Sequence, residues 1–529
     1  MPRECLIKAR RFVTPRWLQL RSCWRGWCTL ALAALLMAPA TAQALPQDPA
    51  AVAGAGIRRL IEAPRFKAAT WGIEVVSLDT GRVLFEHNAG KYLLPASNTK
   101  LFTVAMALQE LGPDLRIRTS LYGTAGPAAD GALPGDLVLF GRGDPTLGRP
   151  WNGGPYRPDP LEALADQLQA QGVRTIQGNL VGDDSYFAEP PYGPGWEWED
   201  LRFAYGAEPT ALAFHHNVAD LWVYPAAAAA QPCFLFVQPG HGLLALRNDT
   251  RTSAAPAEPG IRVDRLPGES VLRVSGSLAP GSGPVRLTVT IRDSALWAAR
   301  LLERALARRG IQVQGLVRSA HYRDRASLDP SRQVELGHID SPPMLEILRE
   351  LLKTSNDLYA QLTLLQVGAR RRGGAGTARQ GLMAMAAWMA RAGLRPDDTA
   401  LEEGAGLSRK NLIKPEGIVR LLAHMDRQPE AAAFRSLLPV AGVDGTLRRR
   451  MLDGPAQGNL RAKTGTLRNT HALSGYVTSA GGERLAFALM LNNDHPGPGE
   501  EAPRAALDAI AELLARLPAS APAPESLSR

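Results

Sequence analysis

The two ends of the chain carry strand-like segments, and helix-like segments lie between them. Apolar and polar alternation predicts strands at 71–77 and 82–86, and again near 460–467, 472–478 and 484–491. Apolar residues at helical spacing predict helices at about 49–64, 101–112, 294–309, 342–366, 376–393, 415–426 and 502–516. Strands at both ends around a helical middle favour one α+β domain, built from segments far apart in the sequence.

Residues from about 113 to 293 interrupt this pattern. Short strand-like runs such as RIRTSLYG, DLVLFG and VRLTVTI alternate there with Gly- and Pro-rich turns, and one helix is predicted near 160–171. We therefore expect a β-rich insert of two small subdomains at 113–293, within a domain formed by 45–112 and 294–517. The Pro-, Ala- and Ser-rich residues 518–529 are expected to be a disordered tail.

Residues 1–44 have the pattern of a secretory signal peptide. Seven basic residues and one acidic residue lie within 1–27, followed by an apolar run at 28–37 and the sequence Ala42-Gln43-Ala44. The apolar run is too short to remain as a membrane-spanning anchor. Its removal leaves 53 basic and 50 acidic residues, so the net charge falls from +9 to +3 and gives little support for nucleic-acid binding. We expect a periplasmic protein without a transmembrane anchor after cleavage.

The cysteines do not predict a disulfide or a metal site. Cys5, Cys23 and Cys28 lie in the predicted signal peptide, so Cys233 has no partner in the mature chain. No cluster of Cys and His residues has the spacing of metal ligands. We therefore expect no metal and no organic cofactor.

The motif Ser97-x-x-Lys100 stands at the start of a predicted helix. Residues three apart lie on one helix face, so the Lys100 amine can reach the Ser97 hydroxyl and remove its proton. Because the chain has 52 Arg and eight Lys, a lysine here is informative: unlike arginine, lysine can lose its proton. Taken alone, the motif also fits a capping serine beside a solvated lysine.

The triplet Ser355-Asn356-Asp357 follows a predicted helical run at 344–354. A hydroxyl with a short polar side chain two residues later can relay a proton and hold a substrate amide. The same triplet also fits a polar turn between two helices.

The segment Lys463-Thr464-Gly465-Thr466 lies on a predicted strand. Alternation places Lys463 and Gly465 on one face and the two threonines on the other. Glycine lets a ligand approach the backbone closely, and a cation with two hydroxyls suits a substrate carboxylate. This motif is weak by itself.

Together and in this order, the three motifs resemble those of penicillin-binding proteins and class A β-lactamases. Ser97 and Ser355 are 258 residues apart, too far for a class A β-lactamase, and Lys463 follows Ser355 by 108. The chain is similar to the D-Ala-D-Ala carboxypeptidase/endopeptidase family of low-molecular-mass class C penicillin-binding proteins, of the penicillin-binding protein 4 type. That resemblance implies a penicillin-binding/β-lactamase-like transpeptidase domain, with an antiparallel sheet and helices, interrupted by a large insert. Further similar stretches are Gly143–Leu147, Tyr205–Ala207, Gly406–Arg409 and Pro439–Leu447.

The resemblance also implies a serine-type peptidase acting on peptidoglycan stem peptides that end in D-Ala-D-Ala, and on their cross-links. Ser97 would be the nucleophile, Lys100 its base and Ser355 a proton relay. Backbone N–H groups of Ser97 and Thr466 would form the oxyanion hole. The substrate would be held by Lys463, Thr464, Gly465 and Thr466, and β-lactams would inhibit by trapping the serine.

Two positions depart from the family's pattern. Asp357 stands where the family has Asn, and a carboxylate only accepts hydrogen bonds, whereas an amide also donates them. Asp357 is therefore a substrate-binding candidate whose contact to a substrate carbonyl group is in question. Two alternatives remain open: Asn356 supplies that contact, or a nearby cation pairs with Asp357. Glu403 stands where the family often has Asp, which affects a loop contact.

Two other functions remain open: a β-lactam-hydrolysing enzyme on the same domain, and a non-catalytic wall-binding or sensor module. Loss of Ser97 or Lys100 would indicate the second, and both residues are present. Trp196 and Trp198 are interpreted as packing within the insert rather than as a sugar-binding platform.

Overall fold

The computed structural model describes residues 48–519, apart from 149–158, 189, 191, 241, 254–259, 267, 328–331, 373–375 and 498–501. The predicted signal peptide and residues 520–529 of the predicted tail lie outside the described residues. Among the described residues, no helix combines the length and apolar character needed to cross a membrane.

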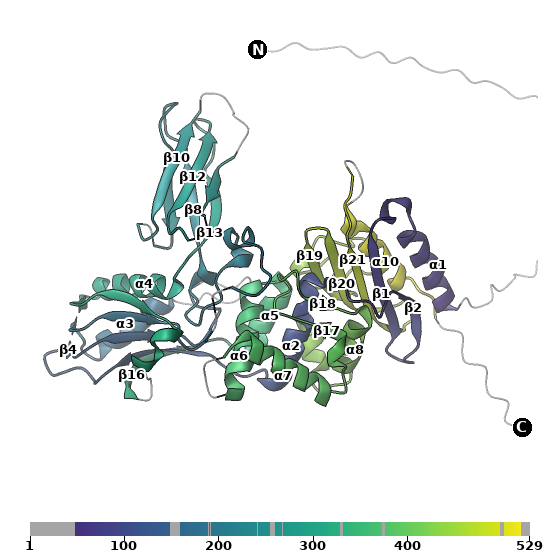
Figure 1. Ribbon diagram of the computed structural model, residues 1–529, viewed down its shortest axis with the longest axis horizontal. Helices are drawn as coiled ribbons and strands as arrows, with labels where there is room; N and C mark the ends of the chain where they lie inside the picture. Colours follow the sequence, from purple (N-terminus) through teal and green to yellow (C-terminus); the bar gives the residue numbers. More distant parts are fainter. Residues whose placement is uncertain are drawn as a thin grey trace, which may run out of the picture. The chain divides into compact units, whose positions relative to one another are not determined.

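One five-stranded sheet joins the two ends of the chain (Figure 1). Its strand order is β19-β20-β21-β1-β2, and every neighbouring pair is antiparallel. β1 pairs with β21 from Thr70 opposite Asn492 to Ser77 opposite Leu485. The strands are β1 (Thr70–Ser77), β2 (Val83–His87), β19 (Arg461–Leu467), β20 (Thr470–Thr478) and β21 (Arg484–Asn492). This sheet confirms the expected α+β class.

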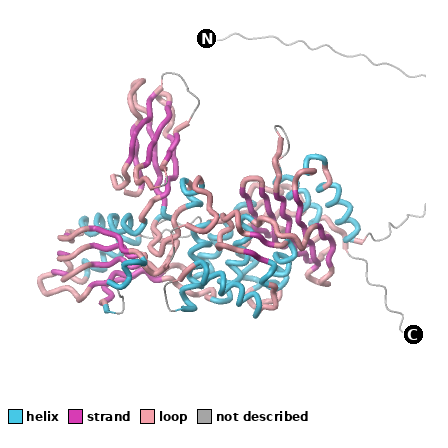
Figure 2. The backbone as a smooth tube through the Cα atoms, in the orientation of Figure 1, coloured by secondary structure: helices cyan, strands magenta, loops and turns pink. Residues whose placement is uncertain are grey.

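Helices cover both faces of the sheet, as the tube view shows (Figure 2). Along β21, Phe487 and Leu489 pack with α1 (Pro49–Ile61) and α10 (Pro503–Ala515). The intervening Ala488 and Met490 pack with the helices of the opposite face, which include α8 (Pro415–Asp426). Because successive strand residues point to opposite faces, a strand buried on both sides becomes continuously apolar.

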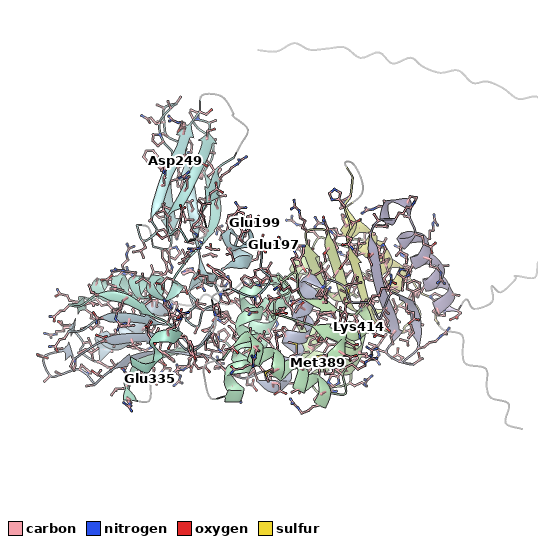
Figure 3. All side chains as sticks on the ribbon, in the orientation of Figure 1. Glu197, Glu199, Asp249, Glu335, Met389 and Lys414 are labelled. Carbon is pink, nitrogen blue, oxygen red and sulfur yellow. The ribbon has the colours of Figure 1, made fainter. Side chains whose placement is uncertain are left out.

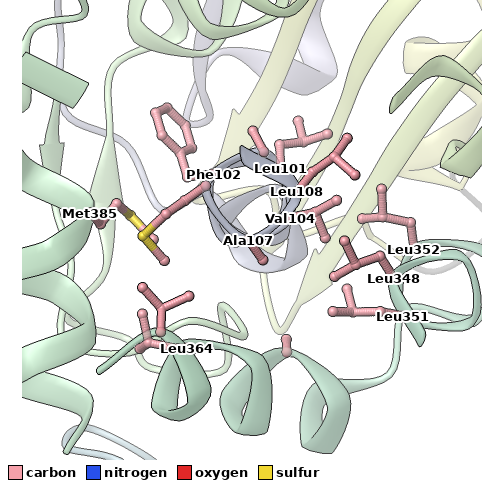
Figure 4. Packing of buried hydrophobic residues seen from close by; sticks show 14 of the residues in the cluster. Leu101, Phe102, Val104, Ala107, Leu108, Leu348, Leu351, Leu352, Leu364 and Met385 are labelled. Carbon is pink, nitrogen blue, oxygen red and sulfur yellow. The ribbon is translucent and has the colours of Figure 1, made fainter. Parts of the chain in front are cut away.

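The helix that begins after Ser97, α2 (Thr99–Glu110), lies at the centre of the helical part of this domain (Figure 4). All residues from Thr99 to Leu108 are buried, since α2 is enclosed by four other helices and the sheet. A helix that is apolar on all sides is stable only in such an interior. The enclosing helices are α8 and three others, α5 (Met344–Thr354), α6 (Asp357–Arg372) and α7 (Ala378–Arg391).

The single helix predicted at 342–366 is wrong, because the chain forms two helices there. Ser355 adopts a left-handed conformation with φ of 61° and ends α5, and α6 starts at Asp357. The break makes the Ser355-Asn356-Asp357 triplet a corner between two helices, in which Ser355 and Asn356 are half-buried and Asp357 is buried. The remaining small elements of this part are α9 (Ala431–Leu437), β17 (Thr399–Ala400) and β18 (Leu412–Ile413).

The insert contains four further sheets. One is five-stranded, in the order β15-β7-β5-β3-β16, and the others are β14-β6-β4, β13-β8-β9 and β10-β12-β11. Two helices, α3 (Pro160–Ala170) and α4 (Ser294–Arg308), pack against the first of these sheets. The strands are β3 (Arg118–Gly123), β4 (Ala132–Leu133), β5 (Leu137–Phe140), β6 (Thr175–Ile176), β7 (Leu180–Asp183), β8 (Val218–Tyr224), β9 (Phe234–Gln238), β10 (Leu246–Thr252), β11 (Arg262–Asp264), β12 (Leu272–Leu278), β13 (Val285–Thr290), β14 (Gln312–Val313), β15 (Val317–Ala320) and β16 (Val334–Asp340).

The strand pairing extends past the expected insert boundary at residue 293. Helix α4 packs on β7 and β15, and β16 pairs with β3 through Asp340. The sequence pattern identified the α4 helix correctly but not the sheet that its apolar face covers. We therefore propose that the insert extends from 113 to about 340, with β8–β13 as its second subdomain, and that α5 is the first element back in the main domain.

Candidate active site

The Ser97 side chain is presented by a strained turn before α2. A short 3₁₀ turn, η2 (Ala96–Asn98), precedes the helix, and Ala96 has a positive φ of 47°. The hydroxyl of Thr99 donates to the Ala96 carbonyl oxygen at 3.0 Å and stabilises the turn. Backbone in this left-handed region is unfavourable for residues other than glycine, so neighbouring segments must hold it in place.

Two glycines allow β19 and the 403–408 loop to approach the Ser97 turn closely. A Cβ on Gly465 of β19 would lie 2.8 Å from the Pro95 carbonyl oxygen. A Cβ on Gly406 would lie 2.0 Å from the Ala96 carbonyl oxygen, and Gly406 has a φ of 87°. Both positions therefore require glycine if β19 and the 403–408 loop are to support the Ser97 turn.

Lys100 lies directly behind Ser97 and is fully buried. Its Nζ donates to Ser97 Oγ at 2.9 Å, and also to the Asp357 carboxylate and the Ala405 carbonyl oxygen. An ammonium group has three donors, and these three acceptors match them. Burying a charge is costly unless it is paired and hydrogen-bonded, and here both conditions are met.

The pairing with Lys100 distinguishes the two alternatives left open at Asp357. Asp357 is the first residue of α6 and forms an ion pair with Lys100. Asn356 uses its side-chain oxygen to accept from the backbone N–H of Tyr359 at 3.2 Å, which caps the helix. In the structure, Asp357 is therefore the residue paired by a nearby cation.

Lys463 is a second fully buried lysine in the site. Its Nζ donates to Ser355 Oγ at 2.7 Å and to the Thr464 carbonyl oxygen at 2.7 Å. Burial, with a smaller effect from the neighbouring Lys100 charge, holds the pKa of Lys463 well below its usual range, and Asp357 acts in the opposite direction. The site thus contains two lysines, each hydrogen-bonded to a serine hydroxyl, and one carboxylate that pairs with Lys100.

The two threonines of the third motif lie on the accessible side of β19. Thr464 Oγ1 donates to Thr446 Oγ1 at 2.9 Å, and Thr466 is exposed. β19 is the outermost strand of its sheet, so its backbone is placed at the border of the cleft.

The loop after β17 is organised by Glu403, a fully buried residue for which the sequence indicated a loop contact but not its partners. One carboxylate oxygen accepts from the Ala405 backbone N–H at 2.7 Å. The other accepts from the Gly406 N–H and from Asn411 Nδ2, each at 2.6 Å. Burial raises the pKa of Glu403, and these backbone hydrogen bonds oppose the rise. Glu403 therefore fixes the loop that directs the Ala405 carbonyl oxygen at Lys100.

A cleft of about 850 Å³ opens in front of Ser97. Insert residues that the sequence analysis did not select form part of its wall, and the nearest sequence signal was the Tyr205–Ala207 resemblance. Arg409 and Glu197 form an ion pair with an Nε to Oε1 distance of 3.3 Å (Figure 3 labels Glu197). Burial and the charge of Asp200, which is hydrogen-bonded to Tyr205, raise the pKa of Tyr205 to about 12. The insert residues in the wall are Glu197, Asp200, Arg202, Phe203 and Tyr205.

The neighbouring tryptophans differ in environment. Trp196 packs over Gly193, as expected for packing within the insert, whereas Trp198 is 53% exposed. The packing interpretation is therefore wrong for Trp198. Within the described ranges, no group of three or more His, Cys, Asp or Glu side chains is arranged to hold a metal ion.

The fold and the Ser–Lys arrangement define a serine peptidase of the penicillin-binding type. Residues 54–517 match the D-Ala-D-Ala carboxypeptidase 3 (S13) family. A D-alanyl-D-alanine carboxypeptidase from Actinomadura sp. (strain R39) is 36% identical over 474 residues, covering 87% of this chain and 84% of the relative. The chain belongs to the S13 family of D-Ala-D-Ala carboxypeptidases.

Solved structures agree with this assignment. The crystal structure of penicillin binding protein 4 (dacB) from Haemophilus influenzae has a TM-score of 0.75 and 25% identity, covering 86% of this chain and 97% of its own. The same protein in complex with a novel β-lactam has a TM-score of 0.70 and 23% identity, covering 86% of this chain and 98% of its own. These similarities confirm the penicillin-binding fold expected from the three motifs.

Replacing Gly406 with alanine should disrupt the Ser97 turn. In the Gly406→Ala variant the new methyl group would collide with the Ala96 carbonyl oxygen, so we expect the rate of acylation by a fluorescent penicillin to fall by about tenfold or more. Gly172→Ala is the matched control, since Gly172 has a φ of 81° but no atom within 4 Å of the added methyl group. Equal acylation rates in the two variants would contradict the proposed support of the turn.

Replacing Asp357 with asparagine should move the pH profile of acylation to lower pH. The Asp357 charge raises the pKa of Lys463, so the Asp357→Asn variant lowers that pKa further, and Lys463 loses its proton at lower pH. The second-order rate of penicillin acylation, measured from about pH 5 to 10, reports the shift. Asp220→Asn, which removes a carboxylate paired with Arg286 in the insert, is the control. An unchanged profile, or one moved to higher pH, would count against this charge coupling.

Proposed function

We propose that the protein is a D-Ala-D-Ala carboxypeptidase and endopeptidase that hydrolyses peptidoglycan stem peptides through an acyl-enzyme on Ser97. The observation that carries the proposal is the 2.9 Å contact between the buried Lys100 amine and the Ser97 hydroxyl, at the floor of an open cleft. Membership of the S13 family supports the substrate class.

Before acylation the Lys100 ammonium group releases one proton to solvent, and the resulting amine takes the proton of Ser97. Ser97 Oγ forms a bond to the carbonyl carbon of the penultimate D-Ala, and the C–N bond to the leaving residue breaks. Backbone N–H groups of Ser97 and Thr466 stabilise the developing oxyanion. Ser355, hydrogen-bonded to Lys463 at 2.7 Å, passes its hydroxyl proton to the leaving amine and is reprotonated by the proton that Lys100 took from Ser97, by way of Lys463. Water then hydrolyses the ester and restores Ser97.

The third motif binds the terminal carboxylate of the substrate. Thr464 and Thr466 present hydroxyls at the accessible side of β19, and Lys463 lies behind them. A carboxylate bound there favours the charged form of Lys463 and offsets the effect of its burial. Gly465 leaves space for the close approach of β19 to the Ser97 turn.

The same serine is proposed to react with β-lactams, which become covalent inhibitors when the acyl-enzyme is hydrolysed slowly. The solved complex of the Haemophilus influenzae relative with a β-lactam supports this proposal. We also propose that residues 1–44 direct export to the periplasm and are then removed, leaving no transmembrane anchor, and that nucleic acid is not a partner.

The Ser97→Ala variant should release no D-Ala from a pentapeptide stem and should form no adduct with a fluorescent penicillin, because the attacking oxygen is missing. Release of D-Ala is measured with the purified mature protein. Retained labelling in this variant would remove Ser97 as the nucleophile. Rapid turnover of penicillin by the unmodified protein, without a long-lived adduct, would favour a β-lactam-hydrolysing enzyme instead.

The Lys100→Arg variant keeps the positive charge but loses the group that can accept a proton. We expect acylation to slow by about 10²–10⁴-fold, the usual contribution of a general base. Lys91→Arg provides the matched control, since Lys91 is exposed. If both variants react at the rate of the unmodified protein, Lys100 is not the base.

A further inference from the structure

A second hollow, of about 840 Å³, adjoins the catalytic cleft. It is formed by the end of α5, the segment 444–450 and the start of α10. We call it the arginine groove because six basic residues line it, against the acidic residues Glu350 and Asp444. The basic residues are Arg349, Lys353, Arg448, Arg449, Arg450 and Arg504.

Two of these cations are occupied by structural partners. Lys353 Nζ donates to both oxygens of Asp444, at 2.6 and 2.8 Å, and Arg450 pairs with Asp508 at 2.6 Å. The other four arginines have no ion-pair partner within the part of the chain that the structure describes, and Arg448, Arg449 and Arg504 are exposed. The groove therefore carries positive charge that no ion pair among the described residues neutralises.

The arginine groove begins beside the threonines that are proposed to bind the substrate carboxylate. Thr446 lines both hollows, and its hydroxyl accepts from Thr464 Oγ1 at 2.9 Å. Because Thr464 and Thr466 hold the carboxylate of the leaving residue, any chain that continues beyond this residue is directed along 446–450. The groove is thus on the leaving-group side of Ser97.

The two proposed substrates differ in the part that lies on the leaving-group side of Ser97. In a pentapeptide stem the leaving group is a single D-Ala, which ends at its carboxylate. In a cross-link the leaving amine belongs to a second stem peptide, which continues and carries further free carboxylates. Arginine pairs with carboxylates through two parallel hydrogen bonds, so the second stem matches the groove in charge and in geometry.

We propose that the arginine groove binds carboxylates of the second stem peptide and selects cross-linked substrate over the single stem. This inference rests on the proposed function. It assigns to Arg448 and Arg449 a role in substrate specificity that the chemistry at Ser97 does not require.

The test compares two substrates in the double variant Arg448→Ala/Arg449→Ala. We expect kcat/KM for cleavage of a cross-linked stem dimer to fall by about tenfold or more, the loss of one to two charged hydrogen bonds. The value for release of D-Ala from a pentapeptide stem should stay within about twofold, because that leaving group does not reach the groove. The double variant Arg251→Ala/Arg262→Ala removes two exposed arginines from the insert and controls for net charge.

A second arm tests the chemistry of the ligand. The substrate is a dimer in which the further carboxylates of the second stem are amidated and the carboxylate of the leaving residue is kept. The unmodified protein should cut it as slowly as the variant cuts the charged dimer. Equal losses on both substrates, or no loss on the dimer, would overturn the inference, as would equal cleavage of the charged and amidated dimers. If the unmodified protein releases no D-Ala from the pentapeptide, the proposed function itself fails.

Discussion

The site depends on the burial of two lysine amines around a single carboxylate. Lys100 and Lys463 are fully buried, and Asp357 pairs with the first and raises the pKa of the second. Taking such charges out of water costs several kcal/mol per ion unless the geometry compensates. The compensation comes from four separate segments, namely α2, the start of α6, β19 and the 403–408 loop, which must therefore be held together closely. The central position of α2 and the glycines at 406 and 465 serve this requirement.

The sequence predicted much of this arrangement because its signals are local. Helical spacing places Lys100 beneath Ser97, and strand alternation places Thr464 and Thr466 on the accessible side of β19. At Ser355 the sequence allowed both a continuous helix and a polar turn between two helices, because apolar residues continue at helical spacing on both sides and the left-handed turn depends on tertiary packing. The proposed end of the insert near 340 lies beyond the boundary expected at 293, because an amphipathic helix such as α4 does not indicate in the sequence which sheet it covers. The insert residues of the cleft wall reach the site through contacts between distant segments, whereas Glu403 acts locally, on the N–H groups of Ala405 and Gly406 and on Asn411.

The family's pattern has asparagine at position 357. The aspartate of this chain gives the site a negative charge that asparagine would not supply. An amide would leave Lys100 without its ion-pair partner, whereas a carboxylate pairs with Lys100 before substrate arrives. The positive charge needed for carboxylates on the leaving-group side is then supplied from outside the buried site, by the arginine groove beyond Thr446. On another wall of the cleft, the insert supplies Glu197, which pairs with Arg409.

Mass spectrometry of the protein trapped with a penicillin tests the assignment of the nucleophile, because it locates the covalent bond. After brief incubation and proteolysis, we expect one adduct, of the mass of one intact penicillin, on the peptide that contains Ser97. An adduct on the peptide that contains Ser355, or a protein that acquires no adduct while it remains folded, would contradict the assignment of Ser97 as the nucleophile.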